Sequence, residues 1–205
     1  MVRCAHNKIS KGDMNMNTIN LTVNDQSLSA LKKDAQITQK RGLPFMMASV
    51  VIWSLILLLQ FWAKPIITIN FYTFMCSSLL MPLAFGFSKI VKADIFKKTN
   101  NPVNKLGFLC TMNQMLYLCI VMWAFSKSPE SMMMLYGMVF GAHLFPYAWV
   151  YDSRSYGIFA IVDTVGVLLL SNAFGNAAAA AFMVVMQIAL SLLLLLEARK
   201  DNREN

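Results

Sequence analysis

The chain has 205 residues, of which 57% are hydrophobic and only 14% are charged, and its mean hydropathy is +0.52. These values lie outside the usual range of soluble domains, and the length suits one membrane bundle without a separate folded domain. The net charge of +8 does not indicate nucleic-acid binding, because nearly all lysines and arginines lie in the tails and in one loop between apolar segments.

The chain begins with two polar regions. Residues 1–26 are rich in Asn, Ser and Lys and lack apolar periodicity, which predicts a disordered tail, and Met14 and Met16 each offer an alternative start of translation. In residues 27–42, the apolar Leu28, Leu31 and Ala35 lie at helical spacing beside a run of charged residues over 32–34, which predicts a short amphipathic juxtamembrane helix with Ser27 as its N-cap. We expect this helix to lie among the lipid headgroups, with docking of a cytoplasmic partner as the alternative.

Six apolar stretches fill the chain from Leu43 to Leu196. About 20 apolar residues at 1.5 Å per residue cross the ~30 Å hydrocarbon core of a bilayer. The stretches are apolar on all sides, unlike the striped helices of soluble proteins. The sequence therefore predicts an all-α, polytopic transmembrane helical bundle, with spans at 43–63, 65–91, 106–126, 131–151, 156–172 and 177–196.

Two features of the sequence add detail to the predicted spans. The second span is longer than a crossing needs and contains Pro82, which predicts a kink or a strong tilt. Loops of about four or five residues follow the third, fourth and fifth spans, so these helices are expected to be antiparallel neighbours. Residues 197–205 are expected to form a cytoplasmic tail.

The basic residues predict the orientation. Sixteen of the 18 lysines and arginines lie in the two tails and in the second and fourth loops, and only Lys64 and Lys127 lie on the other side. Because cytoplasmic segments carry the excess of Lys and Arg, we expect both termini in the cytoplasm. The basic inner face is expected to meet anionic lipid headgroups, and the bilayer itself is the main partner.

Gly137 and Gly141 form a GxxxG motif in the fourth span. Such a motif lets a second helix approach closely. Packing within the chain is the favoured interpretation, and a homodimer through this face is the alternative.

Two ionisable side chains lie well inside predicted spans. His143 is about 12 Å, and Asp163 about 10 Å, from the predicted cytoplasmic ends of their helices at 1.5 Å per residue. Amides on the third and sixth spans fall near the same depth: Asn113, Gln114 and Gln187. Because a charge at the bilayer centre costs about 2.5–3.5 kcal/mol, these groups are expected to face the bundle interior and one another.

This shared polar level has two interpretations. It could be a site that binds a proton, a cation or another small ligand, or it could be a satisfied hydrogen-bond network that fixes helix packing. Asp163 is the stronger functional candidate, since a single histidine among aromatic residues is often only a packed, hydrogen-bonded ring. The rotational phases of the helices, and hence the pairing of these groups, remain open.

The sequence gives little support for an enzymatic activity. There is no HExxH or GxSxG motif, no phosphate-binding glycine loop and no pair of intramembrane carboxylates. The cysteine spacing matches no zinc site, and the methionines are scattered over apolar segments. We therefore expect no catalytic residues, no cofactor and no metal site.

Five short motifs stand at or within the predicted spans: Lys40-Arg-Gly-Leu-Pro-Phe45, Leu80-Met-Pro-Leu-Ala-Phe85, Asn101-Pro-Val-Asn-Lys-Leu-Gly107, Asn113-Gln-Met-Leu-Tyr117 and Gly141-Ala-His143. With these motifs, residues 28–196 resemble a family of small multi-pass membrane proteins of Bacillus-like Firmicutes that is catalogued as a domain of unknown function. The resemblance implies a location in the bacterial plasma membrane and no particular activity. Asp163 lies outside the motifs.

The sequence leaves three function classes open. The leading hypothesis is an integral membrane protein that binds or transports a small solute or cation through a polar bundle interior. The alternative is a non-catalytic membrane subunit or interaction protein that acts through its basic face. An intramembrane enzyme is the remote alternative.

Overall fold

The computed structural model describes residues 27–95 and 100–201. Six helical segments in these ranges are long and apolar enough to cross a membrane, and no strand occurs in them. The predicted all-α bundle with six spans is confirmed. The spans are Lys40–Gln60, Ile66–Val91, Pro102–Lys127, Pro129–Val150, Arg154–Phe174 and Asn176–Asp201.

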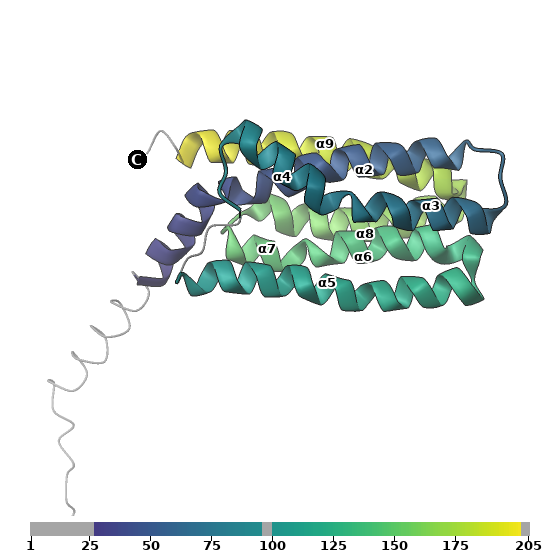
Figure 1. The fold of residues 1–205 in the computed structure, drawn as a ribbon, viewed down its shortest axis with the longest axis horizontal. Coiled ribbons are helices and arrows are strands. Elements are labelled where there is room, and N and C mark those ends of the chain that lie inside the picture. The colour runs from purple at the N-terminus through teal and green to yellow at the C-terminus, as the bar shows by residue number, and fades with distance from the viewer. Residues whose placement is uncertain (1–26, 96–99, 202–205) are drawn as a thin grey trace, which may run out of the picture.

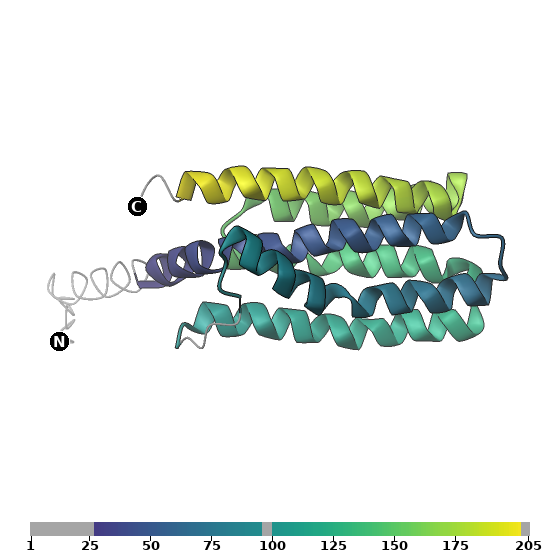
Figure 2. The ribbon, with the colours of Figure 1, turned by 45° about the horizontal axis from the view of Figure 1, so that its top comes forward.

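The helices lie side by side as a bundle, with the start of the described chain and the end of the last helix at the same end (Figures 1 and 2). Helix α2 (Leu43–Gln60) packs against α9 (Asn176–Asp201), and α6 (Met132–His143) packs against α8 (Arg154–Phe174). Half of the most apolar window of the first span is buried, against 11% in the second and third spans. The first span is thus central, and the second and third spans present large apolar surfaces that suit lipid.

The segment before α2 differs from the predicted single helix over 27–42. Residues 27–38 are helical, but Lys40, Arg41 and Gly42 have φ values of 48°, 53° and 73°. Three consecutive left-handed residues cannot continue an α-helix, so the chain turns sharply before α2 begins. Pro44 suits the start of α2, where a missing N–H costs no helical bond.

The helix over 27–38 rests on the bundle. The Asn101 side chain donates hydrogen bonds to the Leu31 carbonyl and to the Asp34 carboxylate, both at 2.8 Å. The Lys32 ammonium lies 3.9 Å from the centroid of the Trp149 ring, close enough for a cation–π interaction. This segment is therefore fixed to the ends of other helices.

The second span is broken into α3 (Ile66–Ser78) and α4 (Leu80–Val91) at Leu79, which confirms the predicted kink. Pro82 has no N–H to donate to the carbonyl of Ser78, and its ring crowds that carbonyl. The bend between the two helices is visible in Figure 2.

The fourth span has a similar break. After a 3₁₀ turn over Pro129–Ser131, α6 ends at His143 and α7 (Phe145–Val150) follows. Pro146 cannot donate to the carbonyl of Ala142, so the α-helical pattern is interrupted between the two helices.

Some span ends lie beyond the predicted ones. Helix α5 (Pro102–Lys127) begins four residues before the predicted 106, because Asn101 caps it by accepting a hydrogen bond from the Val103 N–H at 2.9 Å. Helix α9 continues to Asp201, so part of the predicted 197–205 tail is helical. The predicted disordered region 1–26 and the last four residues lie outside the described residues.

The two glycines of the GxxxG motif face α8 of the same chain. A Cβ atom added to Gly137 would lie 2.9 Å from a methyl group of Val167, and one added to Gly141 would lie 2.7 Å from the hydroxyl oxygen of Thr164. Both approaches are closer than real Cβ atoms tolerate, so glycine is required for this helix contact. A second copy of the chain could reach this face only by displacing α8.

Candidate functional site

The predicted polar residues fall into separate surroundings. Asp163 on α8 and Gln187 on α9 are both completely buried, and the Gln187 amide donates a hydrogen bond to the Asp163 carboxylate at 2.9 Å. The Gln187 carbonyl oxygen in turn accepts a hydrogen bond from the Ser49 hydroxyl of α2 at 3.2 Å. A chain of side-chain hydrogen bonds thus joins three helices deep in the bundle.

Asp163 has no charged partner among the described residues. Its Oδ2 accepts the bond from Gln187, and its Oδ1 is buried without a hydrogen-bond partner. Asp163 lines none of the four main hollows of the described residues. The surroundings of this carboxyl group are therefore those of a packed interhelical contact rather than of a cation site with several oxygen ligands.

His143 does not join Asp163. Its Nδ1 hydrogen-bonds to the carbonyl oxygen of Phe140, and its ring packs edge-on against Phe140 and Tyr147. Gly141 packs on α8 beside Asp163, and the two-residue step from Gly141 to His143 turns the side chain about 200° around the helix. The prediction that these groups face one another is wrong for this pair, because the glycine contact fixes the rotation of α6.

The two amide side chains on α5, Asn113 and Gln114, also lie in different surroundings. Asn113 is exposed and donates a hydrogen bond to the Tyr117 hydroxyl at 2.7 Å, and it lines an outer hollow that His143 also borders. Gln114 is half-buried and lines the same cavity as His143. Asn113 therefore does not face the interior, contrary to the prediction for it, since neighbours on a helix point about 100° apart.

The cavity has a volume of about 110 Å³ and lies among α2, α4, α5, α6 and α7, towards the end of the bundle that holds residues 27–42. It is large enough for several water molecules or for one small organic molecule. Seven of its seventeen lining residues are aromatic. The lining consists of Gln39, Gly42, Phe45, Met46, Leu80, Met81, Ile95, Asn104, Gly107, Phe108, Thr111, Gln114, Phe140, His143, Tyr147, Tyr151 and Tyr156.

Three tyrosines form one wall of the cavity. The ring centroids of Tyr147, Tyr151 and Tyr156 lie 5.8–6.0 Å from one another, within the range of favourable aromatic contacts. Their hydroxyl groups are all engaged: Tyr147 with Thr111 at 2.7 Å, Tyr151 with Gln39 at 2.7 Å, and Tyr156 with the Arg41 carbonyl at 2.8 Å. This wall is therefore held rigidly.

One lining side chain has an unused polar atom. Asn104, on the first turns of α5, is 8% exposed, and its Oδ1 accepts no hydrogen bond from any described residue. A buried acceptor without a partner costs free energy, about 1–3 kcal/mol. Protein atoms cover this oxygen, so it is not itself a contact point for a molecule in the cavity.

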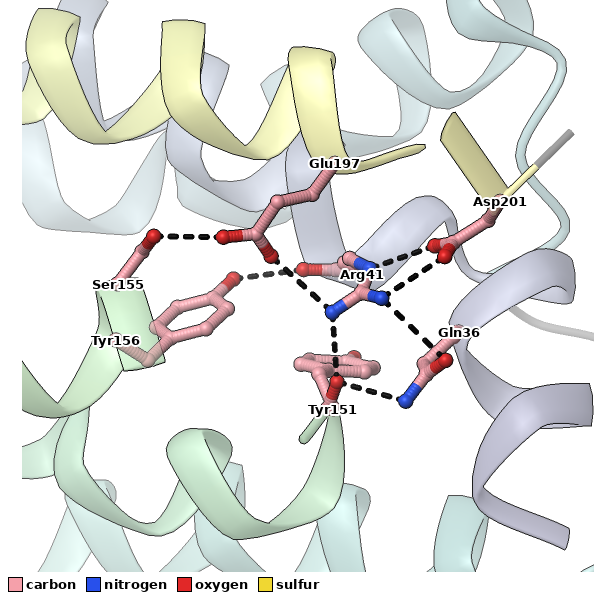
Figure 3. Close-up of polar contacts among 7 residues, drawn as sticks. All are labelled: Gln36, Arg41, Tyr151, Ser155, Tyr156, Glu197 and Asp201. Carbon is pink, nitrogen blue, oxygen red and sulfur yellow. Dashed lines mark hydrogen bonds and ion pairs between the residues drawn. The ribbon is translucent and has the colours of Figure 1, made fainter. Parts of the chain in front are cut away.

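Arg41 lies beside the cavity in a network of polar contacts (Figure 3). Its guanidinium group forms a two-point contact with the Asp201 carboxylate at 2.6 and 2.9 Å, and an ion pair with Glu197 at 3.1 Å. It also donates to the Tyr151 carbonyl at 2.9 Å. We refer to Arg41, Glu197 and Asp201 as the Arg41 clamp. It ties the left-handed turn to the end of α9 and to the α7–α8 connection.

The sequence matches the family of unknown function DUF7010 over residues 28–197. The chain belongs to this family. No curated protein and no solved structure matches the chain. The match confirms the resemblance to a family of unknown function, and it includes the cavity, the buried carboxyl group and all of the Arg41 clamp except Asp201.

Three parts of this site were not predicted from the sequence. The spacing of Tyr147 and Tyr151 places their side chains on one helical face, which is a signal for the tyrosine wall. The predicted third span begins at 106, which leaves Asn104 in a loop. No pattern in the sequence around Arg41 indicates its partners Glu197 and Asp201, because these residues lie at the other end of the chain.

Proposed function

We propose that the protein binds a small organic solute in the membrane-embedded cavity lined by Gln114, His143 and the three tyrosines. The observation that carries the proposal is the space of about 110 Å³ that is bordered by aromatic rings and by the polar side chains of Gln114 and His143. Ligand sites are typically apolar and aromatic hollows with a few polar groups in fixed positions, and this cavity has that composition.

The described contacts favour this site over Asp163. Asp163 lines none of the four main hollows of the described residues and packs against α6, whereas the cavity combines space, aromatic surface and polar atoms. A protein that holds a solute between its spans is suited to move that solute across the membrane, and we propose transport as the purpose of the binding. The proposal makes the chain a binding protein rather than an enzyme.

A screen of small molecules against the purified protein in detergent tests the proposal. We expect a subset of neutral or polar small molecules to raise the unfolding temperature of the wild type. The variant Gln114→Leu removes an amide from the cavity wall and should weaken that stabilisation at least several-fold, because a ligand hydrogen bond contributes about 0.5–1.5 kcal/mol.

The matched control is Asn113→Leu, the same kind of change at the adjacent residue. Asn113 is exposed outside the cavity, so its replacement should leave ligand stabilisation at the wild-type level. Equal losses in the two variants, or a screen in which no compound stabilises the wild type, would contradict binding in this cavity.

We further propose that both termini face the cytoplasm of a bacterial cell, with the chain in the plasma membrane. The distribution of basic residues supports this orientation, with sixteen on one side and two on the other. The Arg41 clamp and the helix over 27–38 then lie at the cytoplasmic surface, where Lys33 and Arg154 are exposed to anionic headgroups.

Cysteine labelling tests this orientation. In a cysteine-free background, a cysteine at Lys33 should be shielded from a membrane-impermeant thiol reagent in intact cells, and a cysteine at Glu130 should be labelled. Both positions are exposed in the structure, so burial does not protect either of them. Labelling of Lys33→Cys in sealed cells would reverse the proposed orientation, and lysed cells provide the control for reactivity.

A further inference from the structure

The second span touches α5 in one half of the bundle and bends away from it in the other half. In the first half, the ring of Phe74 on α3 lies 5.9 Å from the ring of Phe125 on α5, measured between centroids. Beyond the break at Leu79, α4 diverges from α5 in both views of the bundle (Figures 1 and 2). The described residues of α4 and α5 hardly contact each other. The kink therefore leaves a gap between the two helices, towards the end of the bundle that holds residues 27–42.

The cavity borders this gap. Leu80 and Met81 on α4, and Phe108 on α5, are among its lining residues. Met81 is 39% exposed and Phe108 is 63% exposed, so both side chains also face the surroundings of the bundle. These residues belong to segments that are apolar and long enough to cross a membrane, and the surroundings of such segments are lipid. The side of the cavity between α4 and α5 therefore faces the bilayer, from which an apolar chain can enter.

The interior of the cavity suits an apolar chain. No Asp, Glu, Lys or Arg is among the described residues that line it, and seven of the lining residues are aromatic. An ionic group placed inside would be buried without a counter-charge, which is unfavourable. A dry cavity of about 150 Å³ holds one benzene molecule. The present cavity, at about 110 Å³, therefore has space for the end of one chain but not for a whole lipid.

Lysines stand beside the gap, nearer to the end of the bundle. Lys105 precedes Phe108 by three residues, so the two side chains lie on one face of α5. On α4, the Lys89 ammonium lies 4.3 Å from the centroid of the Phe85 ring, and Phe85 follows Met81 by one turn. Both lysines are exposed. Because they are closer to the helix ends than the cavity is, they are placed at the level of the lipid headgroups.

The charge at this end of α4 and α5 favours an anionic headgroup. Three exposed lysines, Lys89, Lys92 and Lys105, lie there, and Asp94 is the single acidic residue among the described residues 80–95 and 100–127. Basic residues near the membrane surface attract anionic headgroups. An apolar interior with a basic rim matches a molecule that has an apolar chain and a negatively charged head.

We propose that the cavity takes the end of an alkyl chain of an anionic amphiphile, which enters from the bilayer between α4 and α5 and keeps its headgroup beside Lys89 and Lys105. This inference rests on the proposed function and specifies the class and the route of its ligand. A single-chain amphiphile, such as an alkyl phosphate, and a two-chain anionic phospholipid share this chemistry, so the experiment includes both.

Photolabelling of the full chain in nanodiscs of phosphatidylcholine tests the proposal. Four probes carry a diazirine at the end of an alkyl chain: dodecyl phosphate, dodecylphosphocholine, dodecyltrimethylammonium and phosphatidylglycerol. Mass spectrometry of the labelled peptides locates the chain end. We expect an anionic probe to label lining residues such as Phe140 and Tyr147 about fivefold more than the zwitterionic and cationic probes do. Stronger labelling by dodecyl phosphate or by phosphatidylglycerol identifies which of the two is the source of the chain.

A pair of double variants tests the lysines. Lys89→Ala with Lys105→Ala should lower labelling by the anionic probe about fivefold or more, and should leave labelling by dodecylphosphocholine unchanged. The matched control, Lys64→Ala with Lys127→Ala, removes the same charge from exposed positions at the other end of the bundle. It should keep the preference for the anionic probe.

A pair of tryptophan variants tests the route. Met81→Trp adds bulk where the cavity meets the gap and should lower labelling of the cavity by every probe several-fold. Met81 is exposed, so the larger side chain can be accommodated without disturbing the core. Met115→Trp is the matched control, because Met115 is 57% exposed on α5 and does not line the cavity. This control should label as the wild type does.

The outcomes separate this inference from the proposed function. Equal labelling of the cavity by all headgroups, or an unchanged anionic preference in the variant that lacks Lys89 and Lys105, overturns the anionic class. Labelling found only outside the cavity, or undiminished labelling in Met81→Trp, overturns the entry from the bilayer. In each of these cases, a screened solute whose effect depends on Gln114 still supports binding in the cavity. Absence of such a solute together with absence of labelling in the cavity removes both proposals.

Discussion

Replacing Arg41 with alanine is expected to destabilise the folded protein by roughly 3 kcal/mol, because it leaves two carboxylates at a partly buried site without their cation. The side chains of Arg41 and Asp201 are only 11% and 14% exposed, whereas that of Glu197 is 28% exposed. The ion pair with Asp201 should therefore contribute most, and the more solvated pair with Glu197 less. Unfolding of the purified variant in mixed micelles measures the change.

Arg41→Lys separates charge from geometry. Lysine keeps the positive charge but cannot form the planar two-point contact with Asp201 or reach the Tyr151 carbonyl at the same time, so it should recover only part of the lost stability. Arg154→Ala is the matched control, since Arg154 is exposed and its loss should change the free energy of unfolding by less than about 0.5 kcal/mol. Equal free energies of unfolding for Arg41→Ala and Arg154→Ala would show that the Arg41 clamp does not stabilise the folded protein.

The Arg41 clamp is also connected to the cavity through neighbouring residues. Its arginine sits in a left-handed turn, and the flanking residues Gln39 and Gly42 line the cavity. Non-glycine residues in this conformation cost about 1–2 kcal/mol each, so the turn persists only because its contacts outweigh that cost. Arg41→Ala should for the same reason weaken ligand binding in the cavity as well as global stability.

Much of the architecture could be predicted from the sequence. Apolar length determines the number of spans, and the positions of Pro82 and Pro146 account for the breaks at Leu79 and after His143. These features depend on local chemistry alone, namely the burial of apolar side chains and the missing N–H of proline. The left-handed turn at Lys40–Gly42 was not predictable, since its stability comes from Glu197 and Asp201, about 160 residues away.

The candidate site was only partly predictable for a different reason. Depth in the bilayer can be counted along each helix, and it correctly places Asp163 and Gln187 close enough to form a hydrogen bond. Rotation about the helix axis cannot be counted in this way. Packing of Gly141 on α8 turns His143 towards α5, and one step along α5 separates the cavity residue Gln114 from the exposed Asn113.

The buried chain of Ser49, Gln187 and Asp163 leads to the second large expected effect. Gln187→Leu should destabilise the protein by about 1–3 kcal/mol, because it removes the only described donor to the Asp163 carboxylate, whereas the Ser49 hydroxyl keeps the Met46 carbonyl as an acceptor at 2.7 Å. Asp163→Asn keeps a carbonyl oxygen for Gln187 and removes a carboxyl group that has no cationic partner. Its stability should equal or exceed that of the wild type.

A double-mutant cycle in mixed micelles distinguishes a structural contact from an ionic site. If the cost of Gln187→Leu comes from an unpaired carboxylate, the same substitution made in the Asp163→Asn background should cost less, by about 1 kcal/mol or more. Ligand binding in the cavity should be unchanged in Asp163→Asn, since this residue lines no part of it. A marked loss of stability in Asp163→Asn alone would instead mean that the carboxyl group is itself stabilising in the folded protein.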